Sequence, residues 1–128
     1  MTMPISRRAA FGGAAAVATI ATTAAAIANP DAELITTCAQ HIISMKAYCD
    51  GSDMADFDND PLWLAYEATR DAISEAEPKT MAGLLAIARA AKAESANPDG
   101  SEDHEHCPAS DWAWLILNVL LRQHDGAA

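Results

Sequence analysis

Apolar residues recur at steps of three and four along most of the chain, which is the spacing of one face of a helix. Such stretches cover residues 31–49, 60–77 and 80–94, and a last one begins at 108 or 110 and ends near 124. No strand-type alternation of apolar and polar residues is found. The pattern predicts an all-α fold, a small bundle of three to four helices that follows an N-terminal signal helix.

Residues that favour helix ends flank these stretches. Asn29-Pro30 and Asp60-Pro61 each place a capping residue before a proline suited to the first helical position, and Thr80 is a third candidate cap. Between the first two helices, residues 51–60 form an acidic segment without periodicity, which predicts a loop. In the last helix, residues 112–121 are apolar on nearly every side except Asn118. We therefore expect the last helix to be the most buried.

The first 28 residues have the three parts of an export signal. Arg7 and Arg8 end a short basic region, residues 9–28 carry no charge, and Ala26 and Ala28 form a small-x-small cleavage pattern. This pattern predicts a cleaved signal at 1–28 and an acidic helical domain at 29–128. The alternatives are an inner-membrane anchor and a helix of a cytoplasmic protein. Because alanine, glycine and threonine gain little from transfer to lipid, no stable membrane span is expected.

The segment Ser6-Arg7-Arg8-Ala9-Ala10-Phe11 resembles the twin-arginine consensus, with the phenylalanine one position late. This resemblance implies the export machinery as a partner and a periplasmic or secreted location. The displaced Phe11 leaves the ordinary secretion route as an alternative.

Charge changes the picture of possible partners. The chain has 18 acidic and 8 basic residues. Loss of Arg7 and Arg8 with the signal would leave six bases against 18 acids, a net charge of −12. Such a surface repels phosphate backbones and anionic membranes, so no nucleic-acid binding is expected. It suits solubility, cation binding or a basic protein partner.

Several stretches together resemble a family of small bacterial proteins that carry twin-arginine signals and have no assigned function. They are the twin-arginine start with residues 30–35 and Cys38, residues 60–63 with 66–67 and 69–73, residues 78–86 with 89–90, and residues 112–114 with 120–122. The resemblance implies a helical exported protein, and it implies no activity, cofactor or catalytic residue.

One candidate metal site has the spacing of a calcium loop. Asp56, Asp58 and Asp60 stand at positions 1, 3 and 5, and Glu67 stands at position 12. Pro61 occupies the position that requires glycine, and it begins a helix that would carry Glu67 away from the other ligands. The alternative is an acidic loop that ends in a helix cap.

A second candidate metal site is His104-Glu105-His106-Cys107, since histidine and cysteine bind zinc and copper. Cys38 and His41 could share a helix face, but the paired spacing of a zinc site is absent. More simply, Cys38 belongs to an apolar stripe, where a free cysteine is a small buried residue.

The cysteines also bear on disulfide formation. Cys38 and Cys49 lie 11 residues apart on one predicted helix, about 16 Å along its axis, and cannot bridge each other. Internal disulfides are possible only between Cys107 and one of these two, and Cys49–Cys107 is the better candidate because both residues flank helix ends.

No nucleophile elbow, phosphate loop or dinucleotide fingerprint is found, so no enzyme is expected. The carboxylates of Glu67, Asp71 and Glu75 are interpreted as a solvated helix face, and the three tryptophans as core residues. The sequence favours an exported, non-catalytic protein that binds a partner through an acidic or tryptophan-containing surface. The alternatives are a small metal-binding protein, with calcium at 56–60 or zinc or copper at 104–107, and a cytoplasmic mimic of nucleic acid.

Overall fold

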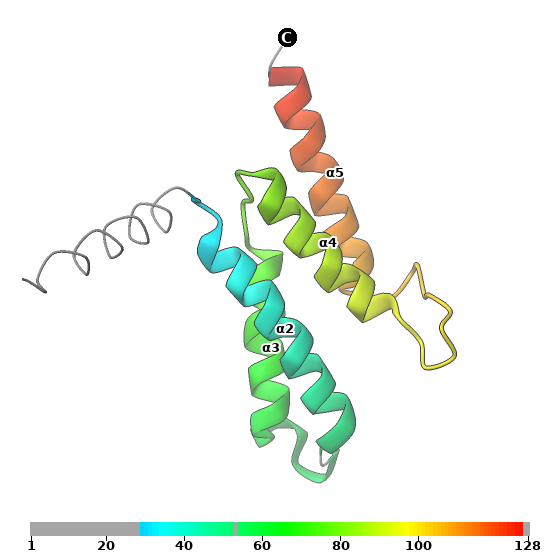
Figure 1. The fold of residues 1–128 in the computed structure, drawn as a ribbon. Helices are drawn as coiled ribbons and strands as arrows, with labels where there is room; N and C mark the ends of the chain where they lie inside the picture. Colours follow the sequence, from blue (N-terminus) through cyan, green and yellow to red (C-terminus); the bar gives the residue numbers. More distant parts are fainter. Residues whose placement is uncertain (1–28, 53, 127–128) are drawn as a thin grey trace, which may run out of the picture.

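The computed structural model describes residues 29–52 and 54–126, and these residues form a small helical bundle (Figure 1). Its elements are α2 (Ala32–Gly51), the 3₁₀ segment η1 (Met54–Asn59), α3 (Pro61–Ser74), α4 (Met81–Ser95) and α5 (Ala109–Gly126). Within these residues there is no strand, only an isolated bridge between Ala96 and Glu102. The predicted all-α fold is confirmed.

The helices form two pairs, α2 with α3 and α4 with α5, and the contact between α2 and α4 joins the pairs. α2 packs against both α3 and α4, and α5 packs mainly against α4. α4 therefore lies between α2 and α5, and α5 stands at the edge of the bundle. In Figure 1 the C-terminal turns of α5 extend past the beginning of α4.

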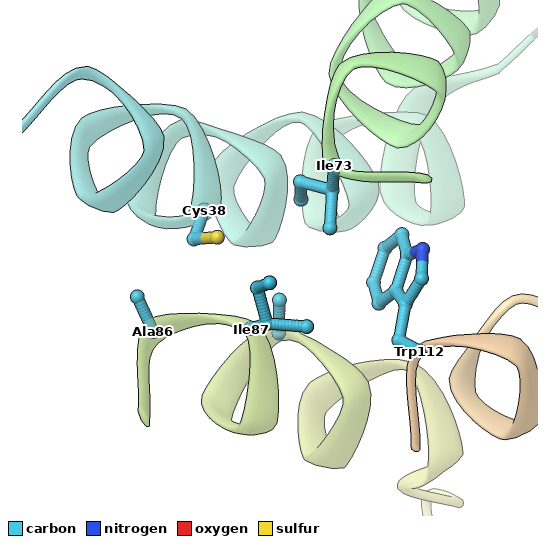
Figure 2. Close-up of a cluster of buried hydrophobic side chains, with 6 residues drawn as sticks. Cys38, Ile73, Ala86, Ile87 and Trp112 are labelled. Atoms are coloured by element: carbon cyan, nitrogen blue, oxygen red, sulfur yellow. The ribbon is translucent and has the colours of Figure 1, made fainter. Parts of the chain in front are cut away.

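The core forms where α2, α3, α4 and α5 meet (Figure 2). It consists of six buried residues: Cys38, Ile73, Ala86, Ile87, Ala90 and Trp112. The two alanines let the backbone of α4 approach its neighbours closely. The predicted burial of Cys38 is confirmed, and burial raises the pKa of its thiol to about 11.

Two of the predicted helix starts are confirmed in detail. The Asp60 carboxylate accepts a hydrogen bond from the backbone N–H of Leu62 at 2.9 Å and caps α3. The Thr80 hydroxyl accepts one from the N–H of Gly83 at 3.1 Å and caps α4. Each satisfies a donor that the first turn of a helix leaves without a partner.

The start of α2 differs from the prediction, because Asn29 caps a turn before the helix rather than the helix itself. Its side-chain oxygen accepts from the N–H of Asp31 at 2.9 Å, and α2 begins at Ala32. The buried Asp31 carboxylate in turn accepts from the backbone N–H groups of Lys79 and Thr80 and from the Thr80 hydroxyl. Asp31 thus joins the start of α2 to the start of α4.

Gly83 is required by this contact. A Cβ atom at position 83 would lie 2.2 Å from a carboxylate oxygen of Asp31. Burial raises the pKa of Asp31, but the hydrogen bonds from Thr80 and Lys79 outweigh burial and hold this pKa below its ordinary value.

Two further expectations need correction. The segment 51–60 is not wholly irregular, because η1 occupies six of its residues. The last helix is not the most buried one: α5 buries only Ala109, Trp112 and Val119, whereas α4 buries seven residues. The physical reason is position: α4 packs against both α2 and α5, whereas α5 packs mainly against α4 and meets only the end of α3, at Ser74. No helix among the described residues is long and apolar enough to cross a membrane.

Candidate binding surface

α5 carries apolar residues on two opposite faces. On the inner face, Trp112 and Val119 are buried, and Leu115 and Ile116 pack against the core. At 3.6 residues per turn, positions 112 and 114 point about 200° apart. Trp114 therefore points away from the bundle.

The outer face is a stripe of large apolar side chains in contact with solvent. Trp114 is 65% exposed, and Leu117, Leu120 and Leu121 are also exposed. Trp114, Leu117 and Leu121 follow one another at steps of three and four, the spacing of a helix–helix seam. We call these four residues the outer stripe.

A groove of about 780 Å³ runs beside the outer stripe. Ser74, at the end of α3, lines it together with eight residues of α5: Asp111, Trp112, Trp114, Leu115, Asn118, Leu121, Arg122 and Asp125. Its apolar middle lies between an acidic residue at the start of α5 and charged residues of both signs at the end.

The inner face is fixed by a specific polar contact as well as by packing. The indole N–H of Trp112 donates to the Ser74 hydroxyl at 3.0 Å, and the indole ring meets the His41 ring edge-on with centroids 5.0 Å apart. A tryptophan with a satisfied N–H and a fully packed ring holds the helix in one rotation. Which apolar stripe faces solvent is therefore determined by Trp112.

Beneath Trp112 lies a buried polar cluster formed by α2, α3 and α4. His41 is 0% exposed; its Nδ1 lies 2.8 Å from the Thr69 hydroxyl and its Nε2 lies 2.7 Å from a carboxylate oxygen of Glu94. An ionised carboxylate only accepts, so Nε2 carries the hydrogen that it donates to Glu94. The Thr69 hydroxyl also reaches the Tyr66 carbonyl at 2.9 Å, so it can donate in either direction.

Two further residues meet Glu94 in this cluster. Burial raises the pKa of Tyr66, and the neighbouring Glu94 carboxylate, which shares a hydrogen bond with the phenol, raises it further. From the loop before α5, His106 Nε2 approaches the second carboxylate oxygen of Glu94 at 3.5 Å. The buried charge of Glu94 thus has partners from three segments, as a buried ion needs.

Trp63 belongs to neither face of α5. Its ring contacts Phe57 of η1 with centroids 4.2 Å apart, and it also contacts Tyr48 and Tyr66. The Arg70 guanidinium stands 5.6 Å from the Trp63 ring centroid. These aromatic contacts pack η1 against the end of α2 and the start of α3. Trp63 is therefore a structural residue.

The predicted calcium ligands are not gathered around one point. Asp56 is exposed and accepts from the Asn59 side chain, and Asp58 is exposed as well. Asp60 caps α3 and accepts from the Ser52 hydroxyl, while Glu67, nearly two turns into α3, pairs with Arg70 at 3.3 Å. Because α3 begins at Pro61, Glu67 lies on the helix and away from the acidic segment that precedes it.

The predicted zinc or copper ligands are likewise dispersed. His104 lines a hollow of about 310 Å³ between α4 and α5, His106 faces Glu94, and Cys107 lies beside the Ser110 hydroxyl. Across residues 29–52 and 54–126, no group of three histidine, cysteine, aspartate or glutamate side chains is placed to hold a metal ion. Metal binding stays a prediction without a preformed site.

The predicted disulfide is absent from the structure, in which Cys49 and Cys107 are exposed free thiols. Cys49 follows Tyr48, whose ring packs on Trp63 near the start of α3. Cys107 instead lines a small pocket with Arg70 and Ser74, toward the end of α3. Arg7, Arg8, Ala26 and Ala28, the residues of the predicted signal, lie outside the described residues.

Comparison with family models, curated proteins and solved structures found no match to this chain. The surface and the buried cluster are therefore interpreted from their own geometry.

The buried pair of His41 and Glu94 was not predicted, although the sequence carries a signal for each residue. His41 stands seven residues after Leu34 and three after Cys38, within the apolar stripe of its helix. Glu94 continues the stripe of Ile87 and Ala90 at the same helical steps. A histidine and a glutamate in the buried stripes of two helices indicate a hydrogen-bonded pair between them.

Proposed function

We propose that this chain is a non-catalytic, exported helical protein that acts by binding a partner protein through the outer stripe of α5. The observation that carries the proposal is the exposure of four large apolar side chains on α5, of which Trp114, Leu117 and Leu121 lie on the face opposite Trp112. Single exposed apolar residues are ordinary on proteins, but a continuous group on one helix marks an interaction surface. The seam spacing and the groove beside Ser74 suit a helix of the partner.

The energy available at this surface is sufficient for specific binding. Full burial of one large apolar side chain contributes roughly 1.5–3 kcal/mol. Trp114, at the N-terminal end of the outer stripe, has the side-chain properties of a binding hot spot, because tryptophan combines a large area with few rotatable bonds. Binding would remove these side chains from water without any change to the inner face.

The geometry of the buried cluster supports a non-catalytic role. His41 is the residue type most used in acid–base chemistry, yet its side chain is fully enclosed, and that of Glu94 is 3% exposed. A catalytic group must come within hydrogen-bond reach of its substrate. Their contacts instead connect α2, α3 and α4.

The export part of the proposal rests on the residues of the N-terminal segment, with Arg7 and Arg8 before an uncharged stretch. Cell fractionation of the tagged full chain tests it. Replacing both arginines with lysine should retain the chain in the cytoplasm if the twin-arginine route is used. Unchanged export would assign the ordinary route, and a wild-type chain found only in the cytoplasm would contradict export.

Photo-crosslinking in cells tests the binding surface. A photoreactive residue replaces Leu117 of the outer stripe, and in a control variant it replaces Leu64 of α3, because both leucines are 47% exposed. We expect a discrete covalent adduct from position 117 and none from position 64. The proposal fails if position 117 gives no adduct, or if both positions give the same adducts in equal yield.

A further inference from the structure

We infer that residues 9–28 cover an apolar face of α4 and α5 as long as the N-terminal segment stays attached to the chain. This inference rests on the proposed function and specifies its control, because the face includes Leu117 and Leu120 of the outer stripe. Removal of the segment would then expose the binding surface. Residues 1–28 themselves lie outside the described residues. Three features of the described part carry the inference: the apolar face, the place where the chain enters the bundle, and the charges beyond the face.

The apolar face lies along α4 and α5, which run side by side in opposite directions (Figure 1). The hollow of about 310 Å³ lies between the last turns of α4 and the first turns of α5. Exposed Leu85 and Met81 continue its lining along α4, toward the start of that helix. Exposed Leu117 and Leu120 continue it along α5. We call the hollow and these four side chains the α4–α5 face. The apolar residues that line the hollow are Ala88, Ala91, Ala109, Ala113 and Ile116.

The chain enters the bundle at the start of α4, where the α4–α5 face begins. The Asp31 carboxylate accepts from the N–H and the hydroxyl of Thr80, which directly precedes Met81. Residues 26–28 in extended form span up to about 10 Å, enough to cross the end of a helix. As a helix, residues 9–25 would extend about 25 Å, and α4, with 15 residues, extends about 22 Å. The segment is therefore long enough to reach the hollow at the far end of the face.

The far end of the α4–α5 face is acidic. Between Lys92 and Arg122 the chain has no lysine or arginine and six acidic residues: Glu94, Asp99, Glu102, Asp103, Glu105 and Asp111. Lys92 lines the hollow but pairs with Glu102, and Asp103 at the same hollow adds a further negative charge. Because the start of α4 holds the other end of the segment, the two arginines that precede residue 9 would come to this acidic end. Their charge complements the loop.

The composition of residues 9–28 also suits this face. Small side chains on both sides let two backbones approach closely, and both the segment and the hollow are rich in alanine. Phe11 is the only aromatic residue of the segment, and it stands at the end that reaches the hollow. Gly12 and Gly13 follow it and permit the turn that would place its ring there. Docking within one chain also benefits from an effective concentration in the millimolar range.

Disulfide trapping in the full chain tests the contact. The chain is made by cell-free synthesis, which keeps the N-terminal segment attached, and Cys49 and Cys107 are replaced with serine. Phe11→Cys together with Ala113→Cys, at an exposed position of the hollow, should form a disulfide within one chain. Phe11→Cys together with Leu64→Cys, at an exposed position in the first turn of α3, is the matched control and should form little. No disulfide at position 113, or equal yields at both positions, would overturn the inference.

A second variant tests the role of charge. Arg7→Gln with Arg8→Gln, in the chain that carries Phe11→Cys and Ala113→Cys, should lower the initial rate of disulfide formation about threefold or more at low salt. Restoring the positive charge with lysine at both positions should restore the rate. A rate that does not depend on the charge at positions 7 and 8 would contradict the contact with the acidic loop.

The outcomes separate this inference from the proposed function. If position 113 forms no disulfide, but position 117 still forms a photo-adduct with another protein in cells, the proposed function survives and the inference fails. If the disulfide forms, but position 117 gives no adduct with another protein, the α4–α5 face holds the chain's own segment and the proposed function fails.

Discussion

Trp112 and Trp114 lie two residues apart on α5 and have opposite surroundings. The ring of Trp112 is 1% exposed, packs on His41 and donates to Ser74, whereas Trp114 is 65% exposed at the groove. The two faces of this helix are similar in hydrophobicity and differ in what they meet. The inner face meets a core with a matching hydrogen-bond acceptor, and the outer face meets solvent. The inner stripe therefore stabilises the fold, and the outer stripe is the surface that we propose for binding.

The largest effect should come from removing the inner tryptophan. Trp112→Ala should lower the free energy of unfolding by about 3–5 kcal/mol, because it leaves a cavity beneath α5 and the Ser74 hydroxyl without its donor. Urea denaturation followed by circular dichroism measures this loss. A loss similar to that of Trp114→Ala would break the distinction between the two faces.

Next in size is the buried acid beneath Trp112. Glu94→Ala should cost about 3 kcal/mol, because it leaves the Nε2–H of buried His41 without an acceptor. Glu94→Gln keeps an oxygen at this position and should cost less. Glu75→Ala, at an exposed acid of α3's end, should change stability by no more than about 0.5 kcal/mol. Equal losses for Glu94→Ala and Glu75→Ala would show that the cluster does not support the inner face.

Asp31 should make the stability of the bundle depend on pH. Burial raises its pKa, but hydrogen bonds from Thr80 and Lys79 hold the net pKa below the ordinary 3.8. The stabilisation is therefore fully present above pH 3.8 and is lost as pH falls through the lower folded pKa. Asp31→Asn should cost about 2 kcal/mol near pH 7 and should weaken the acid dependence. Thermal melts from pH 7 to pH 2 measure both effects, and a variant with the wild-type acid profile would contradict this role.

The smallest effect on folding should come from the outer stripe. Trp114→Ala should change the free energy of unfolding of the monomer by no more than about 0.5 kcal/mol, since its side chain packs on little within the bundle. The same substitution should shift tryptophan emission to shorter wavelength, because the most exposed of the three indoles is removed. Measurements at low micromolar concentration keep folding separate from association. A loss of several kcal/mol there would mean that the outer face contributes to the fold.

Much of the fold could be predicted from helical periodicity and from the capping residues Asp60 and Thr80. Periodicity and capping depend only on residues that are close together in the chain, so the sequence alone reveals them. The position of α5 was misjudged because its composition shows how much apolar surface it has and says nothing of how many neighbours cover it. The buried pair of His41 and Glu94 was missed for a related reason. Its partners are 53 residues apart, and only the packing of α2 on α4 brings them together.

The contact of Asp31 with Lys79 and Thr80 also ties the first described residues to the rest of the bundle. Asn29 supports the turn, and Asp31 holds the start of α4, so the first three described residues already belong to the folded body. A chain that starts at Asn29 keeps every one of these hydrogen bonds. A chain shortened by three more residues loses them all and leaves two backbone donors before α4 without their acceptor. Removal of residues up to and including Asp31 should therefore destabilise the start of α4.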